Sequence, residues 1–263
     1  VVQPVTGGTK VDLGSAKGGV AGTLELTATE LNSFAGASGT TLRLGSSSAG
    51  SMTVSNAIAP GFAGTVSLQS GGSISQAAAG TLTTSRLAAS AAGAVALDTA
   101  TNVVDQFAAS GSGGVKFADN KATLTVASLD GITGVTASAG SVQITNSGAL
   151  AVAQTISAGG TGDALVLAGT AFNNTAGSTA LSAPSGRWIV YSTTPASNTF
   201  GGLVSGNNAV WGATFTGNAR NIDVSPLAGR TVVLWPDADD AGHGAMEVIS
   251  QAAIKAGAEV RMV

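Results

Sequence analysis

The chain has 263 residues and a net charge of −3, and only 10% of its residues are charged. Glycine accounts for 38 residues, about twice its usual share, and an average soluble domain is about 25% charged, so this is not an ordinary enzyme composition. The negative charge disfavours nonspecific binding to nucleic acid or to anionic lipid. The chain has no cysteine, which excludes disulfides and thiolate metal ligands and is compatible with both the cytosol and export.

The apolar content of 44% supplies enough valine, leucine and isoleucine to form a folded core. Aromatic residues are only 4%, so this core is built from small and β-branched side chains, which favours a thin, elongated β architecture. No run approaches the roughly 18 apolar residues that a membrane-spanning helix needs, and no basic-then-apolar leader begins at Val1. We therefore expect no membrane span.

A repeated pattern runs from Val20 to about Leu181: a short alternating strand, then a turn of glycine, serine, alanine or asparagine. Each strand carries two apolar residues at the period of two that places both side chains on one face. The clearest pairs are Leu42/Leu44, Met52/Val54, Val66/Leu68, Val95/Leu97, Val115/Phe117, Leu124/Val126, Val142/Ile144 and Leu165/Leu167. In the most regular stretch the pair Val95/Leu97 recurs as Val115/Phe117 and Ser90 recurs as Ser110, and elsewhere the interval between comparable pairs drifts.

A repeat of about 20 residues is typical of one turn of a coil, in which successive turns stack and bury their apolar faces inside. The alternative is an antiparallel sandwich, which would need Asn-Gly or Asp-Gly hairpin turns about every 8–12 residues. Asp130-Gly131 is the one dipeptide that fits this requirement. We therefore predict a mainly β fold, a parallel β-helix.

Four segments resemble the secreted filamentous-haemagglutinin type of exoprotein, a bacterial adhesin passenger family built on a right-handed parallel β-helix. They are residues 72–76, residues 95–97, residues 141–146 and, most specifically, the Gly-Arg-Trp-x-x-Tyr-Ser strand within residues 185–193. The resemblance covers about residues 20–215. It implies an adhesive exoprotein, secreted or at the bacterial cell surface, whose partner is a host or bacterial surface glycan or protein. Exposed end rungs would also allow chains to associate end to end.

The sequence changes character between Thr216 and Pro226, since 15 charged residues lie in positions 1–218 and ten in the last 45. We therefore divide the chain into a β-helix region with its linker, residues 1–216, and a second segment, residues 217–263. Residues 231–235 form a continuous apolar run suited to a buried parallel strand. Residues 244–256 have helical periodicity and residues 260–263 suit a second strand, which completes a short C-terminal βαβ unit.

Asp237 and Asp239 follow the first of these strands, at the strand end where βαβ units place functional side chains. Two carboxylates at this spacing can bind Mg²⁺. Residues 227–242, with the helix and final strand, resemble the second half of a toprim domain, the metal-binding catalytic fold of DNA primases and topoisomerases. The resemblance implies that Asp237 and Asp239 are the Asp-x-Asp metal ligands and that Asp240 is an outer or substrate-facing carboxylate.

The toprim family also needs a catalytic glutamate on an earlier strand, and the only upstream glutamates, Glu25 and Glu30, lie within the repeats. The segment is therefore a remnant that we do not expect to be an enzyme, and we assign no catalytic residue. Without the resemblance, the three aspartates are better explained as a cluster at a helix N-terminus, where they accept backbone N–H groups; with it, ancestry as a metal site is favoured. His243 is the only histidine, so a histidine triad or zinc site has no partners.

Two further features have competing explanations. Trp188 and Tyr191 would form either a cap on the end of the β-helix, which we favour, or a glycan-stacking platform, and Trp211 and Phe215 would pack at the linker. The glycine runs at residues 111–114 and 159–162 lack the lysine and helix of a phosphate loop, which indicates turns between rungs.

The favoured function is therefore a structural and adhesive exoprotein that needs no cofactor. The alternative is a cytoplasmic nucleic-acid-processing protein that binds Mg²⁺, and a chimeric joining of the two segments is a third explanation.

Overall fold

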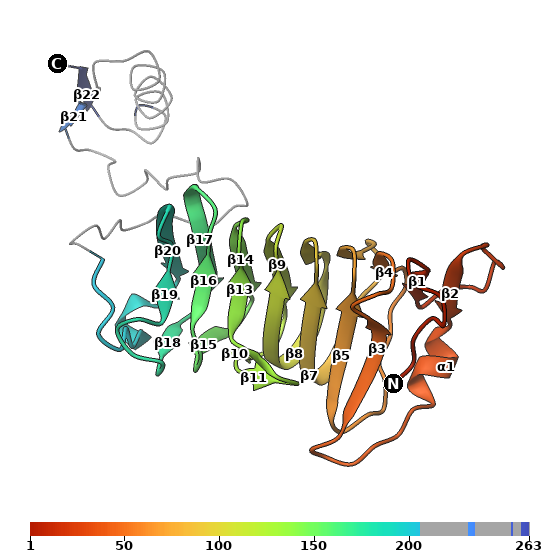
Figure 1. Ribbon diagram of the computed structural model, residues 1–263. Helices are drawn as coiled ribbons and strands as arrows, with labels where there is room; N and C mark the ends of the chain where they lie inside the picture. Colours follow the sequence, from red (N-terminus) through yellow and green to blue (C-terminus); the bar gives the residue numbers. More distant parts are fainter. Residues whose placement is uncertain (206–230, 235–253, 255–258, 263) are drawn as a thin grey trace. The chain divides into compact units, whose positions relative to one another are not determined.

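The computed structural model describes residues 1–205, 231–234, 254 and 259–262 (Figure 1). The chain divides into two compact units, Val1–Val204 and Ser205–Val263. The first unit is a parallel β-solenoid of about seven turns, which confirms the predicted parallel β-helix. The predicted segment boundary at residues 216 and 217 lies outside the described residues.

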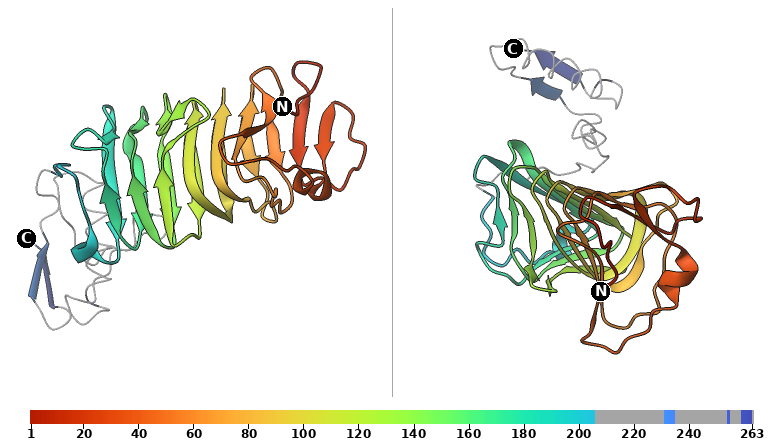
Figure 2. Two further views of the ribbon diagram at one scale, coloured as in Figure 1. Left: turned by 90° about the horizontal axis from the view of Figure 1, so that it is seen from below. Right: turned by 45° about the vertical axis from the view of Figure 1, so that its right-hand side comes forward.

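The solenoid wall has two main faces, each a stack of short parallel strands, as Figure 2 shows from below and obliquely. We call the first face sheet B. In spatial order its strands are β2 (Thr23–Leu26), β1 (Lys10–Leu13), β4 (Met52–Val54), β6 (Ile74–Gln76), the start of β8 (Val95–Gly111), β9 (Val115–Asp119), β14 (Val142–Asn146), β17 (Gly162–Gly169) and β20 (Gly186–Ser192).

The second face is sheet A, into which the long strand β8 also continues. Its strands are β3 (Thr41–Ser46), β5 (Thr65–Ser70), β7 (Thr83–Ala91), the end of β8, β10 (Thr123–Val126) with β13 (Val135–Ala137), β15 (Ala149–Val152) with β16 (Ile156–Ala158), and β18 (Phe172–Asn174) with β19 (Leu181–Ser182). From β3 onward, each turn of the coil therefore contributes strands to both sheets.

The core lies between the sheets and is lined by the apolar pairs that the sequence predicts. All eight pairs are buried, and none of their side chains is more than 5% exposed. Three phenylalanines supply the largest fully buried side chains, and two of them, Phe107 and Phe117, stack with ring centroids 4.0 Å apart. Small aliphatic residues fill the rest, as the low aromatic content predicts.

Strand register shows how the length of a turn varies. Val95 pairs with Val115 and Leu97 with Phe117, which confirms the predicted repeat in this stretch. Val115 then pairs with Val142, so the next turn is longer. The longer turn contains an antiparallel hairpin of β11 (Ser128–Leu129) and β12 (Ile132–Thr133). An inserted segment can thus leave the wall while the register of the next turn is preserved.

Three other elements complete the described chain. Helix α1 (Ala28–Asn32) follows β2 at the N-terminal end of the solenoid, and a single 3-10 turn, η1 (Pro195–Ser197), follows β20. In the second unit, β21 (Thr231–Leu234) pairs in parallel with β22 (Glu259–Met262), and both lie where the sequence predicts strands. Within the described residues, no helix is both long and apolar enough to cross a membrane.

Candidate functional surfaces

The predicted metal ligands Asp237 and Asp239 lie outside the described residues, as do Asp240, His243, Trp211 and Phe215. The described neighbour of this segment is β21, which ends at Leu234. Among the described residues, no three His, Cys, Asp or Glu side chains come together as a metal site would require. The magnesium site therefore stays a prediction.

The predicted aromatic pair belongs to β20, the last strand of sheet B. Trp188 is half-buried, is registered with Leu165 and packs against the core, which is the position that an end cap occupies. Tyr191 is three residues further along the same strand, so its side chain points to the opposite face of the sheet. The two rings therefore do not form one glycan-stacking platform.

The glycine runs lie at turns of the coil. Residues 111–114 connect β8 to β9, and residues 159–162 connect β16 to β17. Each run leads into a strand, whereas a phosphate loop leads into a helix whose N-terminus faces the phosphate. The prediction of turns between rungs is therefore confirmed.

Hydroxyl side chains form a continuous row on the outer face of sheet A. We call this row the hydroxyl ladder; its members are Ser90, Ser110, Thr136, Ser157 and Ser182, each registered with the next. Neighbouring strands lie about 4.8 Å apart, so the hydroxyls repeat at that interval. Thr136 and Ser182 are exposed and the others are partly exposed. The sequence repeat already contains the first two members, but the other three follow at unequal intervals along the chain and are not visible as a repeat.

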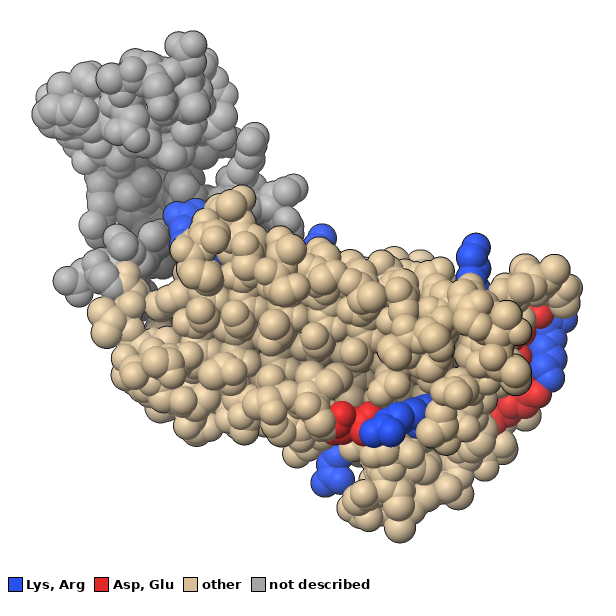
Figure 3. All heavy atoms as spheres, in the orientation of Figure 1, with Lys and Arg blue, Asp and Glu red and all other residues tan. Residues whose placement is uncertain are grey.

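The outer face of sheet B changes in character along its length. Its central row is Glu25, Asp12, Thr53, Ser75, Ala96, Lys116, Gln143, Val166 and Ile189, each registered with the next. The row is acidic at the N-terminal end, mostly polar in the middle with one charged residue, Lys116, and apolar at β17 and β20. Figure 3 shows that charged side chains gather near the N-terminal end and along the lower edge, while most of the face drawn is uncharged.

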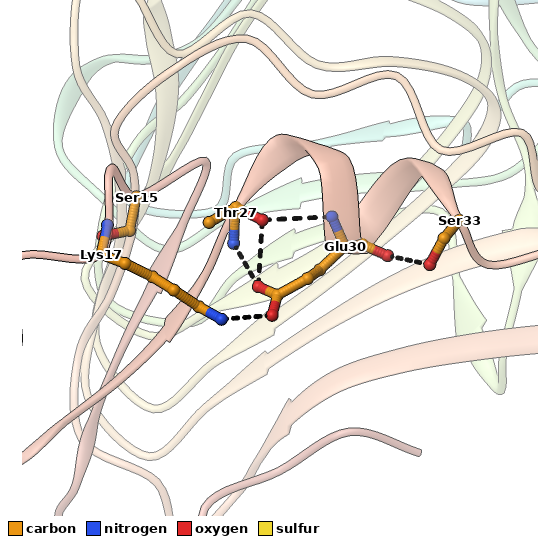
Figure 4. A network of polar contacts seen from close by, with 5 residues as sticks. All are labelled: Ser15, Lys17, Thr27, Glu30 and Ser33. Atoms are coloured by element: carbon orange, nitrogen blue, oxygen red, sulfur yellow. Dashed lines mark hydrogen bonds and ion pairs between the residues drawn. The ribbon is translucent and has the colours of Figure 1, made fainter.

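A network of polar contacts, which we call the N-terminal cap, holds helix α1 at the N-terminal end of the solenoid (Figure 4). Thr27 Oγ1 accepts the backbone N–H of Glu30 at 3.1 Å, and Glu30 accepts the backbone N–H of Thr27 at 2.9 Å, which is a complete capping box. Lys17 forms an ion pair with Glu30. Hydrogen bonds from Lys17 and Thr27 lower the pKa of Glu30 to about 2, so this carboxylate stays charged in weak acid.

The second upstream glutamate belongs to the same cap. Glu25 accepts Ser15 Oγ at 2.9 Å and the backbone N–H of Gly19 at 2.8 Å, and these contacts hold the loop before β2 in place. The hydrogen bond from Ser15 is the main cause of a lowered pKa of Glu25. Both glutamates therefore have structural partners at the N-terminal end of the coil.

A stack of polar side chains is buried where the chain leaves sheet B. Gln76, Asn102, Asp119 and Asn146 are each at most 6% exposed, and Asp119 is registered with both asparagines. Gln76 Nε2 donates to Asn102 Oδ1 at 2.7 Å, and Asn102 Oδ1 also accepts the backbone N–H of Leu82 at 2.9 Å. The stack satisfies backbone groups at the corner of successive turns.

Asp119 is the ionisable member of this stack. Its Oδ1 accepts the backbone N–H of Val104 at 2.9 Å and its Oδ2 that of Lys121 at 3.0 Å. Burial nevertheless raises the pKa of Asp119 to about 6, because desolvation disfavours the charged form more than these donors stabilise it.

Comparison with known proteins gives no relative. No protein-family description, no curated protein and no solved structure matches the chain. The fold and the surfaces described above are therefore the observations from which a function can be inferred.

Proposed function

We propose that this chain is a segment of a structural and adhesive exoprotein, which presents an elongated β-helical surface for attachment at a bacterial cell surface. The observation that carries the proposal is the parallel solenoid of about seven turns, with the uncharged hydroxyl ladder on sheet A and a largely uncharged face in Figure 3. A solenoid of this kind extends by stacking turns and offers the same outward position many times over.

The partner proposed is a glycan or protein on a host or bacterial surface. The hydroxyl ladder supports a polar, uncharged partner, because its five members can donate and accept hydrogen bonds at a regular interval. No charged residue interrupts the row, so attraction by net charge plays little part. This attachment is expected to be multivalent and weak per contact.

The test is binding of the fluorescently labelled chain to bacterial and epithelial cells. Saturable binding above that of an inert protein of equal size is expected, and its absence on every surface tested would overturn the proposal. Periodate treatment of the cells removes glycan partners and protease treatment removes protein partners, so the two treatments identify the class of receptor.

Variants then locate the binding face. Thr136→Arg with Ser182→Arg places two bulky charges on the hydroxyl ladder, and Ser75→Arg with Gln143→Arg places the same charges on the outer row of sheet B. The ladder variant is expected to lose binding and the sheet B variant to keep it. Circular dichroism and the urea midpoint check that both variants stay folded.

The parallel pairing of β21 with β22 favours a second proposal for the C-terminal unit. Parallel strands need a crossover connection, as in the βαβ unit of a toprim domain. This proposal assigns Mg²⁺ to Asp237 and Asp239 and a nucleic acid as partner. Isothermal titration with Mg²⁺ and Mn²⁺ tests it: binding should disappear in Asp237→Ala with Asp239→Ala, and absence of binding in the unmodified chain would exclude it.

A further inference from the structure

The hairpin β11–β12 leaves the coil and folds back over its wall. Asp130 and Gly131 form its two-residue turn, with φ of 49° and 79°. Positive φ at both central residues is the signature of a type I′ turn, which matches the twist of a tight hairpin. We call residues 128–133 the strap.

The strap lies on the outer face of sheet A. It contacts β7 and β8, near which Figure 1 labels β11. Leu129 packs on Ala88 and Ala108. These two alanines alternate with core residues and so point outward, yet neither has any exposed surface. Ser67, registered with Ala88 on the next strand, is also outward and fully buried. Small side chains on three successive strands thus let the strap lie close to the wall.

An ion pair fixes the tip of the strap. Arg43 Nε donates to Asp130 Oδ2 at 2.9 Å, and Arg43 Nη2 donates to Asp130 Oδ1, so the contact is bidentate. The Asp130 side chain is only 5% exposed, and the arginine lowers its pKa. Charge-assisted bidentate pairs combine strength with a defined geometry.

The ion pair joins turns that are not neighbours. The strap leaves the wall between β10 and β13, whereas Arg43 lies on β3, four strands away through β8, β7 and β5. The distance from the strap's point of departure to β3 is four strand intervals, about 19 Å. Three extended residues of the strap cover about 10 Å of this distance, and the long side chain of Arg43 covers most of the rest. Three other side-chain ion pairs of the solenoid, Lys17–Glu30, Lys121–Asp105 and Arg187–Asp163, join the same or adjacent turns.

We propose that the strap is a lock that makes the turns from β3 to β13 open as one cooperative unit. In a solenoid each turn contacts only its neighbours, so terminal turns can fray one at a time. Because Arg43 and Asp130 lie in the first and fifth of these turns, β3 cannot separate from β5 without breaking the ion pair. The strap therefore couples the N-terminal turns to the middle of the coil. This inference does not depend on the attachment proposal.

The test is native-state hydrogen exchange of the full chain, followed by mass spectrometry at low urea concentrations. In the unmodified protein, amides of β3, β5, β7 and β13 should exchange with one common urea dependence. In Asp130→Asn, exchange in β3 and β5 should become roughly fivefold faster, with a smaller urea dependence, while β17 is unchanged.

Asp163→Asn is the matched control, because it breaks the Arg187–Asp163 pair between the adjacent strands β17 and β20. Its effect should stay within those strands. A second variant deletes residues 127–133. In the unmodified chain Val126 pairs with Phe107 and Val135 pairs with Ala109, both on β8. After the deletion Val135 follows Val126 by two residues, as Ala109 follows Phe107, so both pairings on β8 can be kept. In this deletion variant the amides of β17 should stay protected from exchange, and those of β3 and β5 should exchange faster.

Two results would overturn the inference. One is that β3 and β5 already open independently of β13 in the unmodified protein. The other is that Asp130→Asn and the deletion both leave exchange in β3 and β5 unchanged, which would make the strap a surface insertion with no effect on cooperativity.

Discussion

Asp119→Asn tests the electrostatics of the buried polar stack. In the folded protein the pKa of Asp119 is raised from 3.8 to about 6, with burial as the main cause. Between these two values the folded state holds a proton that the unfolded state has released. The contribution of Asp119 to the free energy of unfolding is therefore fully present below pH 3.8, and it is lost as pH rises through 6.

The expected size follows from the shift. A difference of about two between the folded and unfolded pKa values corresponds to about 3 kcal/mol, of which about 2 kcal/mol falls between pH 4.5 and 7.5. Asparagine does not titrate, so the free energy of unfolding of the variant should not show this decline between pH 4.5 and 7.5. The stability of the variant at a single pH is less informative, because two effects oppose each other. Asparagine removes the buried charge, but it has only one oxygen to accept the backbone N–H groups of Val104 and Lys121.

Urea denaturation at half-unit intervals from pH 4.5 to 7.5 measures the difference between the two proteins. Comparing slopes removes the contribution of other titrating groups, including the glutamates of the N-terminal cap, whose lowered pKa values act in the opposite direction at lower pH. Asp105→Asn is the control, since it removes the same charge from a side chain that is 48% exposed, paired with Lys121 at 2.9 Å. Equal slopes for the unmodified protein and Asp119→Asn would refute the argument.

Three further substitutions probe packing, capping and backbone geometry. Phe107→Ala should lower the free energy of unfolding by about 3–5 kcal/mol in urea, because this ring is fully buried and stacked on Phe117; a loss below about 1 kcal/mol would contradict it. Thr27→Ala removes the N-cap of α1 and should cost about 1 kcal/mol, measured as faster hydrogen exchange within the helix. Gly134→Ala should cost more than about 1 kcal/mol in the same urea assay, since φ is 68° and an added Cβ would lie 1.9 Å from the Thr155 carbonyl oxygen; unchanged stability would show that the turn adjusts.

The course of the coil could be predicted because short stretches of sequence specify it. Two apolar residues at i and i+2 define a strand with one buried face, and their return after about 20 residues defines a turn. Val95, Val115 and Val142 follow this rule and stack in register. The pattern misses the start of the coil, since β1 begins at Lys10, ahead of the first predicted repeat at Val20, with a charged residue at two of its four positions.

The buried polar stack could not be predicted by the same logic. Asn102 and Asp119 occupy inward positions that the alternating pattern assigns to apolar side chains. Each is buried because it hydrogen-bonds backbone groups that the corner of the coil would otherwise leave unpaired, and that need is visible only once the turns are stacked. The polar character of these two side chains alone would favour the surface, against the inward position that the strand pattern gives them.

The strap shows where local information and global arrangement separate. Asp130-Gly131 is a hairpin signal in the sequence, and the structure has a hairpin there, although such a signal is typical of a sandwich. A tight turn fixes only the two residues at its tip and the strands beside it. The hairpin covers the outer face of sheet A because Ala88 and Ala108 are small enough for Leu129 to pack on them. The ion pair at its tip depends on Arg43, which lies far upstream in the chain. A solenoid is nearly one-dimensional, so contacts of this kind are few, and each one carries cooperativity that the repeats do not supply.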